Sequence, residues 1–279
     1  MTLAVLSVLR DESSSLPSFF AFLEGLENQS LFGDLYFSFY ENDSSDGTCH
    51  QLAHWLSSRS GSFISEHFGE SPHGTFSQHS SRTLRLADAR NKALIPLLST
   101  DCRWLLVVDA DVIACPSHVH RLLEILLANP NASMVCASTV QYVPDILGNA
   151  PYSYYDTWAL RDLDGNGGIT FLQNPFQKPT DRFRWMSGLP VSVMSAFGGM
   201  SILSLDTVRL VQARWDGHDG CEHWAFCDAM RQCGPVLACP TVMPLVQHLD
   251  GVPRWTETYA MRIKQFIASM PQLGVLPEL

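Results

Sequence analysis

The stretch Arg103–Asp111, with the sequence RWLLVVDAD, decides the fold. Its first part, Arg103–Val108, is a short apolar segment of the kind expected for a strand that is buried on both faces in the middle of a parallel sheet. Two carboxylates, Asp109 and Asp111, follow directly, so both leave the end of a buried strand. By itself an Asp-x-Asp tripeptide occurs in many chains, and a solvated turn in which Asp111 caps a helix explains it equally well.

Segments with strand and helix patterns alternate on both sides of this stretch. Further strands are predicted at Leu3–Leu9, Asp34–Tyr40, Ser62–Ser65, Ser195–Leu203 (after a Gly-rich turn) and Thr241–His248. Helices are predicted at Leu16–Leu26, Cys49–Ser58, Thr83–Leu98, Pro116–Ala128 and His223–Gly234. The region Asn149–Pro190 predicts a long ordered loop. The alternation predicts an α/β fold with a mostly parallel central sheet flanked by helices and a loop-rich second half.

Composition and charge exclude several classes of protein. Apolar residues make up 46% of the chain and charged residues 16%, which favours a compact globular enzyme over a disordered chain. The net charge of −10 argues against a nucleic-acid partner, because such a partner needs clustered Lys and Arg. No apolar run reaches the roughly 18 residues of a membrane span, and no basic leader precedes the first strand. We therefore expect no transmembrane segment and a soluble, cytoplasmic protein with at most a peripheral membrane role. The eight cysteines are expected to be structural thiols.

Acidic clusters follow two of the predicted strands. Ligands of open α/β sheets bind beyond the carboxyl ends of the strands, and both Glu41–Asp46 and Asp109–Asp111 fall at such ends. Carboxylate and phosphate oxygens suit Mg²⁺ or Mn²⁺, so Asp109–Asp111 predicts a divalent metal site shared with a diphosphate. His248, at the end of a late strand, is a candidate third ligand or a structural histidine.

One helix carries polar residues toward the same strand ends. Asp88, Arg90 and Asn91 are expected to lead toward them, whereas Arg82 and Arg85 are expected at solvent.

Three segments of the first half resemble a known superfamily. Glu41–Thr48 (ENDSSDGT) resembles the nucleotide-binding turn of GT-A-type nucleotide-sugar glycosyltransferases. Val107–Asp111 (VVDAD) resembles their metal motif, and Ala89–Leu94 (ARNKAL) resembles the helix before that motif. The resemblance implies one GT-A domain over residues 1–279, with a nucleotide-binding half at 1–112 and an acceptor-binding half at 113–279.

Segments of the second half are similar, in the same order, to segments of the fungal capsule-associated α-1,3-mannosyltransferase family. They are Tyr154–Asp162 (YYDTWALRD), Pro190–Met200 (PVSVMSAFGGM) and Cys221–Asp228 (CEHWAFCD). This resemblance implies that a hexose moves from a nucleotide-sugar to a hydroxyl of a glycan or glycoconjugate. GDP-mannose is the favoured donor, and a UDP-sugar is the alternative.

The superfamily resemblance also implies roles for individual residues. Asp111 would bind Mn²⁺ or Mg²⁺ directly, Asp109 would contact the metal or the ribose, and His248 would be the late histidine ligand. The remaining donor-binding candidates are Asp43 and Arg90 for the nucleoside and Gly198 and Gly199 for the donor sugar, which backbone amides at glycine can approach closely.

Sugar transfer also needs a carboxylate beside the reacting carbon. Glu222 is the preferred candidate, as general base in an inverting reaction or as a group that orients the acceptor in a retaining one, and Asp228 is the second. An ordinary acidic helix start explains Glu222 as well. The expected wall for the acceptor or donor sugar consists of Asp156, Trp158, Arg161 and Asp162. Anchoring of the long loop by Tyr154, Tyr155 and Trp158 is a structural interpretation of equal weight.

Two other functions fit the same superfamily. A nucleotidyltransferase that makes sugar nucleotides would need a Gly-rich basic loop after the first strand, and the loop Arg10–Ser15 contains no glycine. A non-catalytic sugar-binding module would have no need to retain Asp109, Asp111, Glu222 and His248 together.

Overall fold

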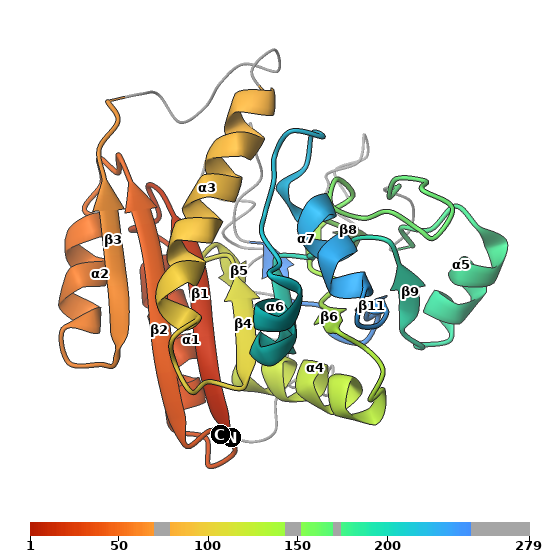
Figure 1. Cartoon of the computed structure of the whole chain (residues 1–279), viewed down its shortest axis with the longest axis horizontal. Helices are drawn as coiled ribbons and strands as arrows, with labels where there is room; N and C mark the ends of the chain where they lie inside the picture. Colours follow the sequence, from red (N-terminus) through yellow and green to blue (C-terminus); the bar gives the residue numbers. More distant parts are fainter. Residues whose placement is uncertain (70–78, 143–151, 170–173, 247–279) are drawn as a thin grey trace.

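A computed structural model describes residues 1–69, 79–142, 152–169 and 174–246 (Figure 1). The first half alternates strand and helix: β1 (Thr2–Leu9), α1 (Leu16–Glu27), β2 (Asp34–Asn42), α2 (Thr48–Leu56), β3 (Gly61–Glu66), α3 (His79–Leu97), β4 (Trp104–Val108), β5 (Val112–Ile113) and α4 (Pro116–Ala128). The second half has shorter elements: β6 (Met134–Cys136), β7 (Val140–Tyr142), β8 (Tyr152–Tyr154), α5 (Pro179–Met186), β9 (Val191–Val193), β10 (Met200–Ser204), α6 (Leu205–Val211), α7 (Glu222–Arg231), β11 (Val236–Ala238) and β12 (Leu245–Val246).

The strands form two sheets. The large sheet has the order β3-β2-β1-β4-β10-β6-β11-β9. Strands β3, β2, β1 and β4 are parallel, β10 is antiparallel to both of its neighbours, β6 and β11 are parallel, and β9 is antiparallel to β11. A small sheet, β5-β12-β7-β8, begins just after the Asp109–Asp111 turn. The predicted mostly parallel α/β sheet is therefore confirmed.

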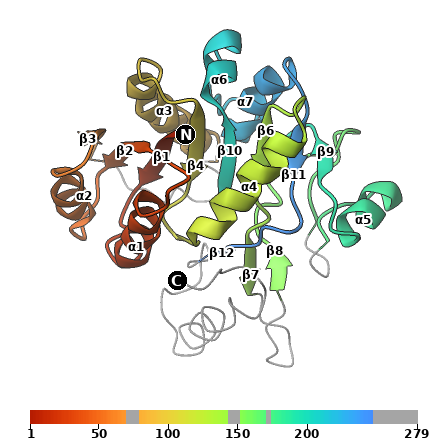
Figure 2. The same ribbon diagram turned by 90° about the horizontal axis from the view of Figure 1, so that it is seen from below.

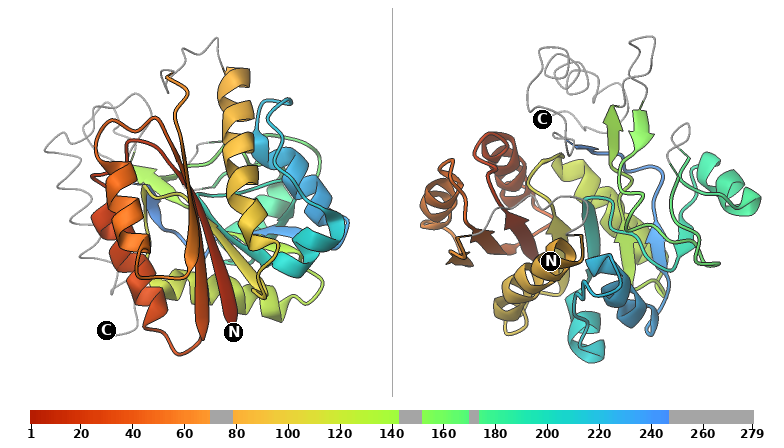
Figure 3. Two further views of the ribbon diagram at one scale, coloured as in Figure 1. Left: turned by 60° about the vertical axis from the view of Figure 1, so that its left-hand side comes forward. Right: turned by 90° about the horizontal axis from the view of Figure 1, so that it is seen from above.

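Helices cover both faces of the large sheet (Figures 2 and 3). Helices α1, α2 and α4 lie on one face, and α3, α6 and α7 lie on the other. Strand β1 shows how the sequence produces two cores: Leu3 and Val5 pack with the first group of helices, whereas Ala4 and Leu6 pack with the second. Because successive side chains of a strand point to opposite faces, the apolar run in β1 supplies both cores.

The predicted elements of the first half are all present, with ends that move by a few residues. Two short elements, β8 and α5, interrupt the predicted long loop region Asn149–Pro190. Both are short, and α5 owes its place to the burial of Trp185 against Tyr154 and Phe176. The short elements β5, β6, β7, β9, α6 and β11 were not predicted.

No helix in the described part of the chain is long and apolar enough to cross a membrane. The eight cysteines are all free thiols, and most are buried, as predicted.

Candidate active site

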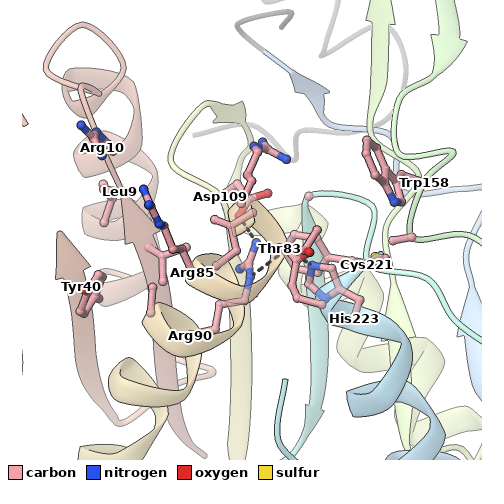
Figure 4. A pocket seen from close by; sticks show the side chains of 18 of the residues that line it. Leu9, Arg10, Tyr40, Thr83, Arg85, Arg90, Asp109, Trp158, Cys221 and His223 are labelled. Atoms are coloured by element: carbon pink, nitrogen blue, oxygen red, sulfur yellow. Dashed lines mark hydrogen bonds and ion pairs between the residues drawn. The ribbon is translucent and has the colours of Figure 1, made fainter. Parts of the chain in front are cut away.

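A cleft of about 1300 Å³ opens at the carboxyl ends of β1, β2 and β4. One wall comes from the end of β1 and from α3, the floor from the turn after β4, and the opposite wall from residues 155–159 and 221–223. Figure 4 shows Arg10 and Arg85 on the β1 side, Arg90 and Asp109 in the centre, and Trp158 on the far side. The cleft therefore lies where parallel α/β sheets bind their ligands.

Arg90 is the buried centre of this site. Arg90 is 3% exposed, and its Nη2 donates to Oδ1 of Asp109 at 3.1 Å. Its Nε lies 3.6 Å from Oε1 of Glu222, and its guanidinium lies 4.8 Å from the ring centre of Phe197. Burial opposes the positive charge, but the carboxylates of Asp109 and Glu222 outweigh burial and raise the pKa of Arg90. Arg90 is therefore a permanent cation that holds together residues from three distant segments.

A third carboxylate, Asp156, lines the same cleft. Its Oδ2 accepts from the backbone N–H of Gly198 at 2.8 Å and its Oδ1 from that of Ala159 at 3.2 Å. Burial raises the pKa of Asp156 to about 6, and the charges of Glu222 and Asp109 add to the rise. Burial likewise raises the pKa of Asp109, against the opposing effect of Arg90. Three carboxylates thus share one buried guanidinium, and the excess negative charge suits a cation.

The floor of the cleft brings Asp109, Ala110 and Asp111 to the space beside Arg90. Within the described ranges, no group of three or more His, Cys, Asp or Glu side chains could hold a metal ion on its own. A cation with one or two carboxylate ligands is typical of Mg²⁺ that keeps waters and binds substrate phosphates. The donor set of Asp109 and Asp111 fits such a shared site. His248 lies outside the described residues.

Basic side chains line the β1 side of the cleft. They are Arg10, Arg82 and Arg85, and the field of Arg82 also acts on Asp109. Arg82 and Arg85 are exposed, as expected, but their exposure is to this cleft. The sequence does not predict this wall, because helical spacing shows which residues share a face but not what that face meets.

The two glycines take different places. Gly199, with φ +67°, lines the cleft, and its carbonyl accepts from the N–H of Asp109 at 2.9 Å. Gly198, with φ +65°, packs so tightly that a Cβ would lie 1.9 Å from the carbonyl oxygen of Ala137. Its amide donates to Asp156. Close backbone packing under the site thus explains the need for glycine at position 198.

Besides Gly198, four predicted site residues do not line the cleft. Asp43 accepts from the amides of Phe68 and Gly69 at 2.8 and 2.9 Å, so it orders the end of β3. Asp228 is exposed on α7 near Arg231, the guanidinium of Arg161 stacks on Trp224, and Asp162 accepts from the amides of Asp164 and Asn166 in its own turn. The structure brings Arg90, Asp109, Asp111, Asp156, Trp158, Gly199 and Glu222 together instead.

Comparison with solved structures shows the same fold. The mannosyltransferase PcManGT from Pyrobaculum calidifontis, in complex with GDP-Man and Mn²⁺, matches with a TM-score of 0.55 and 12% identity over 97% of this chain and 64% of that one. S. aureus TarS matches with a TM-score of 0.53 and 8% identity over 97% of this chain and 39% of that one. The chain thus spans less than two thirds of either protein. No curated protein sequence matches it.

The sheet order, the cleft at the strand ends and these likenesses define the class: the fold is that of the GT-A glycosyltransferases. A family model sharpens this assignment. The model described as Cryptococcal mannosyltransferase 1 matches residues 13–233, and the chain belongs to that family of glycosyltransferases. The resemblance to the fungal capsule-associated family is confirmed.

Proposed function

We propose that the chain is a metal-dependent glycosyltransferase that moves a hexose from a nucleotide-sugar to a glycan hydroxyl. Mannose from GDP-mannose is favoured because the family is described as a mannosyltransferase, and a UDP-sugar is the alternative. The observation that carries the proposal is the buried Arg90 among the carboxylates of Asp109, Asp156 and Glu222, beside a cleft with a basic wall. Residues 1–112 would form the nucleotide-binding half and 113–279 the acceptor-binding half.

The two sides of the cleft suit the two ends of a nucleotide-sugar. Arg10, Arg82 and Arg85 would neutralise the diphosphate, because guanidinium groups bind phosphate oxygens in a bidentate manner. Asp109 and Asp111 would hold Mn²⁺ or Mg²⁺ between the protein and that diphosphate. When bound, the cation would stabilise the charge of the leaving group.

Glu222 is the carboxylate proposed to act at the reacting centre. It is 7% exposed, lies at the first position of α7, and lines the cleft. The contact with Arg90 holds the Glu222 side chain on the side of the cleft opposite the basic wall of Arg10, Arg82 and Arg85. There it would accept the proton of the acceptor hydroxyl in an inverting reaction or orient the acceptor in a retaining one.

The acceptor side has a candidate sugar platform. Trp158 is 44% exposed, and its Nε1 donates to the carbonyl of Gly220 at 2.7 Å, which fixes the plane of the ring. Sugars present C–H faces that pack on such rings. The cleft volume of about 1300 Å³ exceeds the roughly 300–1,000 Å³ of an ordinary small-molecule pocket. The space therefore suits a donor and an acceptor together.

The direct test is release of nucleotide from a panel of GDP- and UDP-sugars, with Mn²⁺ and with EDTA. We expect turnover of one donor that EDTA abolishes and Asp111→Asn lowers by about 100-fold. Asp206→Asn is the matched control, because Asp206 is exposed on α6 and its ion pair is with Arg209 in its own helix. Absence of both turnover and Mn²⁺-dependent nucleotide binding would reject the proposal.

A further inference from the structure

His223, which follows Glu222 in the sequence, is buried beside the carboxylate of Glu222. His223 is 4% exposed, and its Nε2 lies 3.4 Å from Oε1 of Glu222. Its ring stacks on Phe197 with 4.2 Å between ring centres and 13° between planes. Arg90 approaches the same oxygen, Oε1, at 3.6 Å (Figure 4 shows Arg90 and His223 in the cleft wall). Two nitrogens thus lie near the same oxygen of Glu222, and both residues line the cleft with it.

The indole of Trp215 fixes which nitrogen of His223 carries the proton. Its Nε1 donates to Nδ1 of His223 at 3.3 Å. An indole nitrogen is a donor only, so Nδ1 must be the unprotonated acceptor. The neutral imidazole then carries its proton on Nε2, which is the nitrogen that faces Glu222. Burial lowers the pKa of His223 well below its ordinary value, and the charge of Arg90 adds to the effect.

Trp215 is itself rigidly held. Its ring stacks on Phe226 with 4.1 Å between ring centres and 12° between planes. Asn91 on α3 accepts from its backbone N–H at 3.0 Å and donates to its carbonyl at 2.9 Å. The indole therefore has little freedom to turn away from His223, and α3 positions both Arg90 and, through Asn91, the imidazole.

We infer that His223 is a positioning residue, held as the neutral Nε2–H tautomer by Trp215, that with Arg90 fixes the carboxylate of Glu222 for the transfer step. The inference rests on the proposed function, because it gives Glu222 a role in the reaction. A neutral donor orients the carboxylate without adding a second buried positive charge beside Arg90. The carboxylate thus keeps more of its ability to attract the proton of an acceptor hydroxyl.

The first test reads the tautomer directly. ¹⁵N chemical shifts of histidine-labelled protein, assigned by the peak lost in His223→Gln, should show only Nε2–H at position 223 from about pH 5.5 to about pH 8. In Trp215→Phe the constraint on Nδ1 is gone, and the Nδ1–H tautomer or the imidazolium should appear. An Nδ1–H signal at position 223 in the wild-type protein overturns the inference.

The second test separates positioning from packing. Trp215→Phe should lower kcat about tenfold with the donor KM within about twofold, because it frees the imidazole that positions Glu222 for the transition state and leaves the donor site intact. Its control is Trp104→Phe, since the buried Nε1 of Trp104, at the far end of β4, has no hydrogen-bond partner among the described residues. His223→Gln keeps an N–H donor and should retain more kcat than His223→Phe, which keeps only the ring.

The outcomes are distinct. The inference fails if the wild-type enzyme is active and Trp215→Phe keeps its kcat. It also fails if the kcat of His223→Phe equals or exceeds that of His223→Gln. A folded wild-type chain that transfers no sugar from any donor shows instead that the proposed function fails.

Discussion

Asp156→Asn should change how stability depends on pH. Asp156 is a carboxyl group whose pKa rises from an ordinary 3.8 to about 6, chiefly by burial. The folded state then binds this proton more tightly than the unfolded state does. Its contribution to the free energy of unfolding is therefore complete at low pH and is lost as the pH rises from about 4 to about 6.

The magnitude follows from the two pKa values. One pKa unit corresponds to 1.36 kcal/mol, so the rise from 3.8 to about 6 is worth at most about 3 kcal/mol. Asparagine cannot ionise and lacks this pH dependence. It also presents an N–H₂ group to one of the two amides that Asp156 accepts from, but that cost is the same at every pH. We therefore expect the stability of the variant minus that of the wild type to increase by up to about 3 kcal/mol between pH 4 and pH 7.

The assay is urea unfolding of the metal-free protein, followed by tryptophan fluorescence, at several pH values. Asp206→Asn is the control, since removing its exposed helix pair should change stability by less than about 0.5 kcal/mol at each pH. If the difference in free energy of unfolding between Asp156→Asn and wild type stays constant from pH 4 to pH 7, the burial of Asp156 among like charges is refuted.

Three further perturbations follow from the same site. Arg90→Gln should destabilise the fold by about 3–5 kcal/mol in urea unfolding at pH 7, because it removes the buried guanidinium between the partly exposed carboxylate of Asp109 and the buried carboxylate of Glu222; a loss below about 1 kcal/mol would contradict these ion pairs. Gly198→Ala should cost about 2 kcal/mol or more, since its φ is +65° and its Cβ would collide with backbone, whereas Gly165→Ala, at φ +85° with no atom of a described residue within 4 Å of the new Cβ, should cost about 1 kcal/mol; equal losses in thermal melts would remove the packing argument. With nucleotide present, Mn²⁺ at about 100 times its Kd should stabilise the wild type by about 2.7 kcal/mol but leave Asp111→Asn unchanged, and equal stabilisation of both would place the metal elsewhere.

Much of the fold could be predicted from local patterns. The apolar segment at β4 and the alternation of strands and helices through α4 predicted the parallel half of the sheet, because burial on both faces leaves a continuous apolar run. The same patterns placed Asp109 and Asp111 at a strand end. The short elements of the second half were beyond this reasoning: α5, for instance, has one buried residue, Trp185, and its position depends on packing with distant aromatic rings.

What the sequence determined by itself is a carboxylate pair after a buried strand, since strand burial and its periodicity are local properties of the chain. Only the tertiary structure decided what that pair faces. Arg90 reaches Asp109 from α3 and Glu222 reaches Arg90 from α7, and no spacing in the sequence encodes these distances. The same holds for the tautomer of His223, which depends on an indole at Trp215. Charge balance in a buried site depends on which side chains folding brings within a few ångströms of one another, and that is a property of the packed fold.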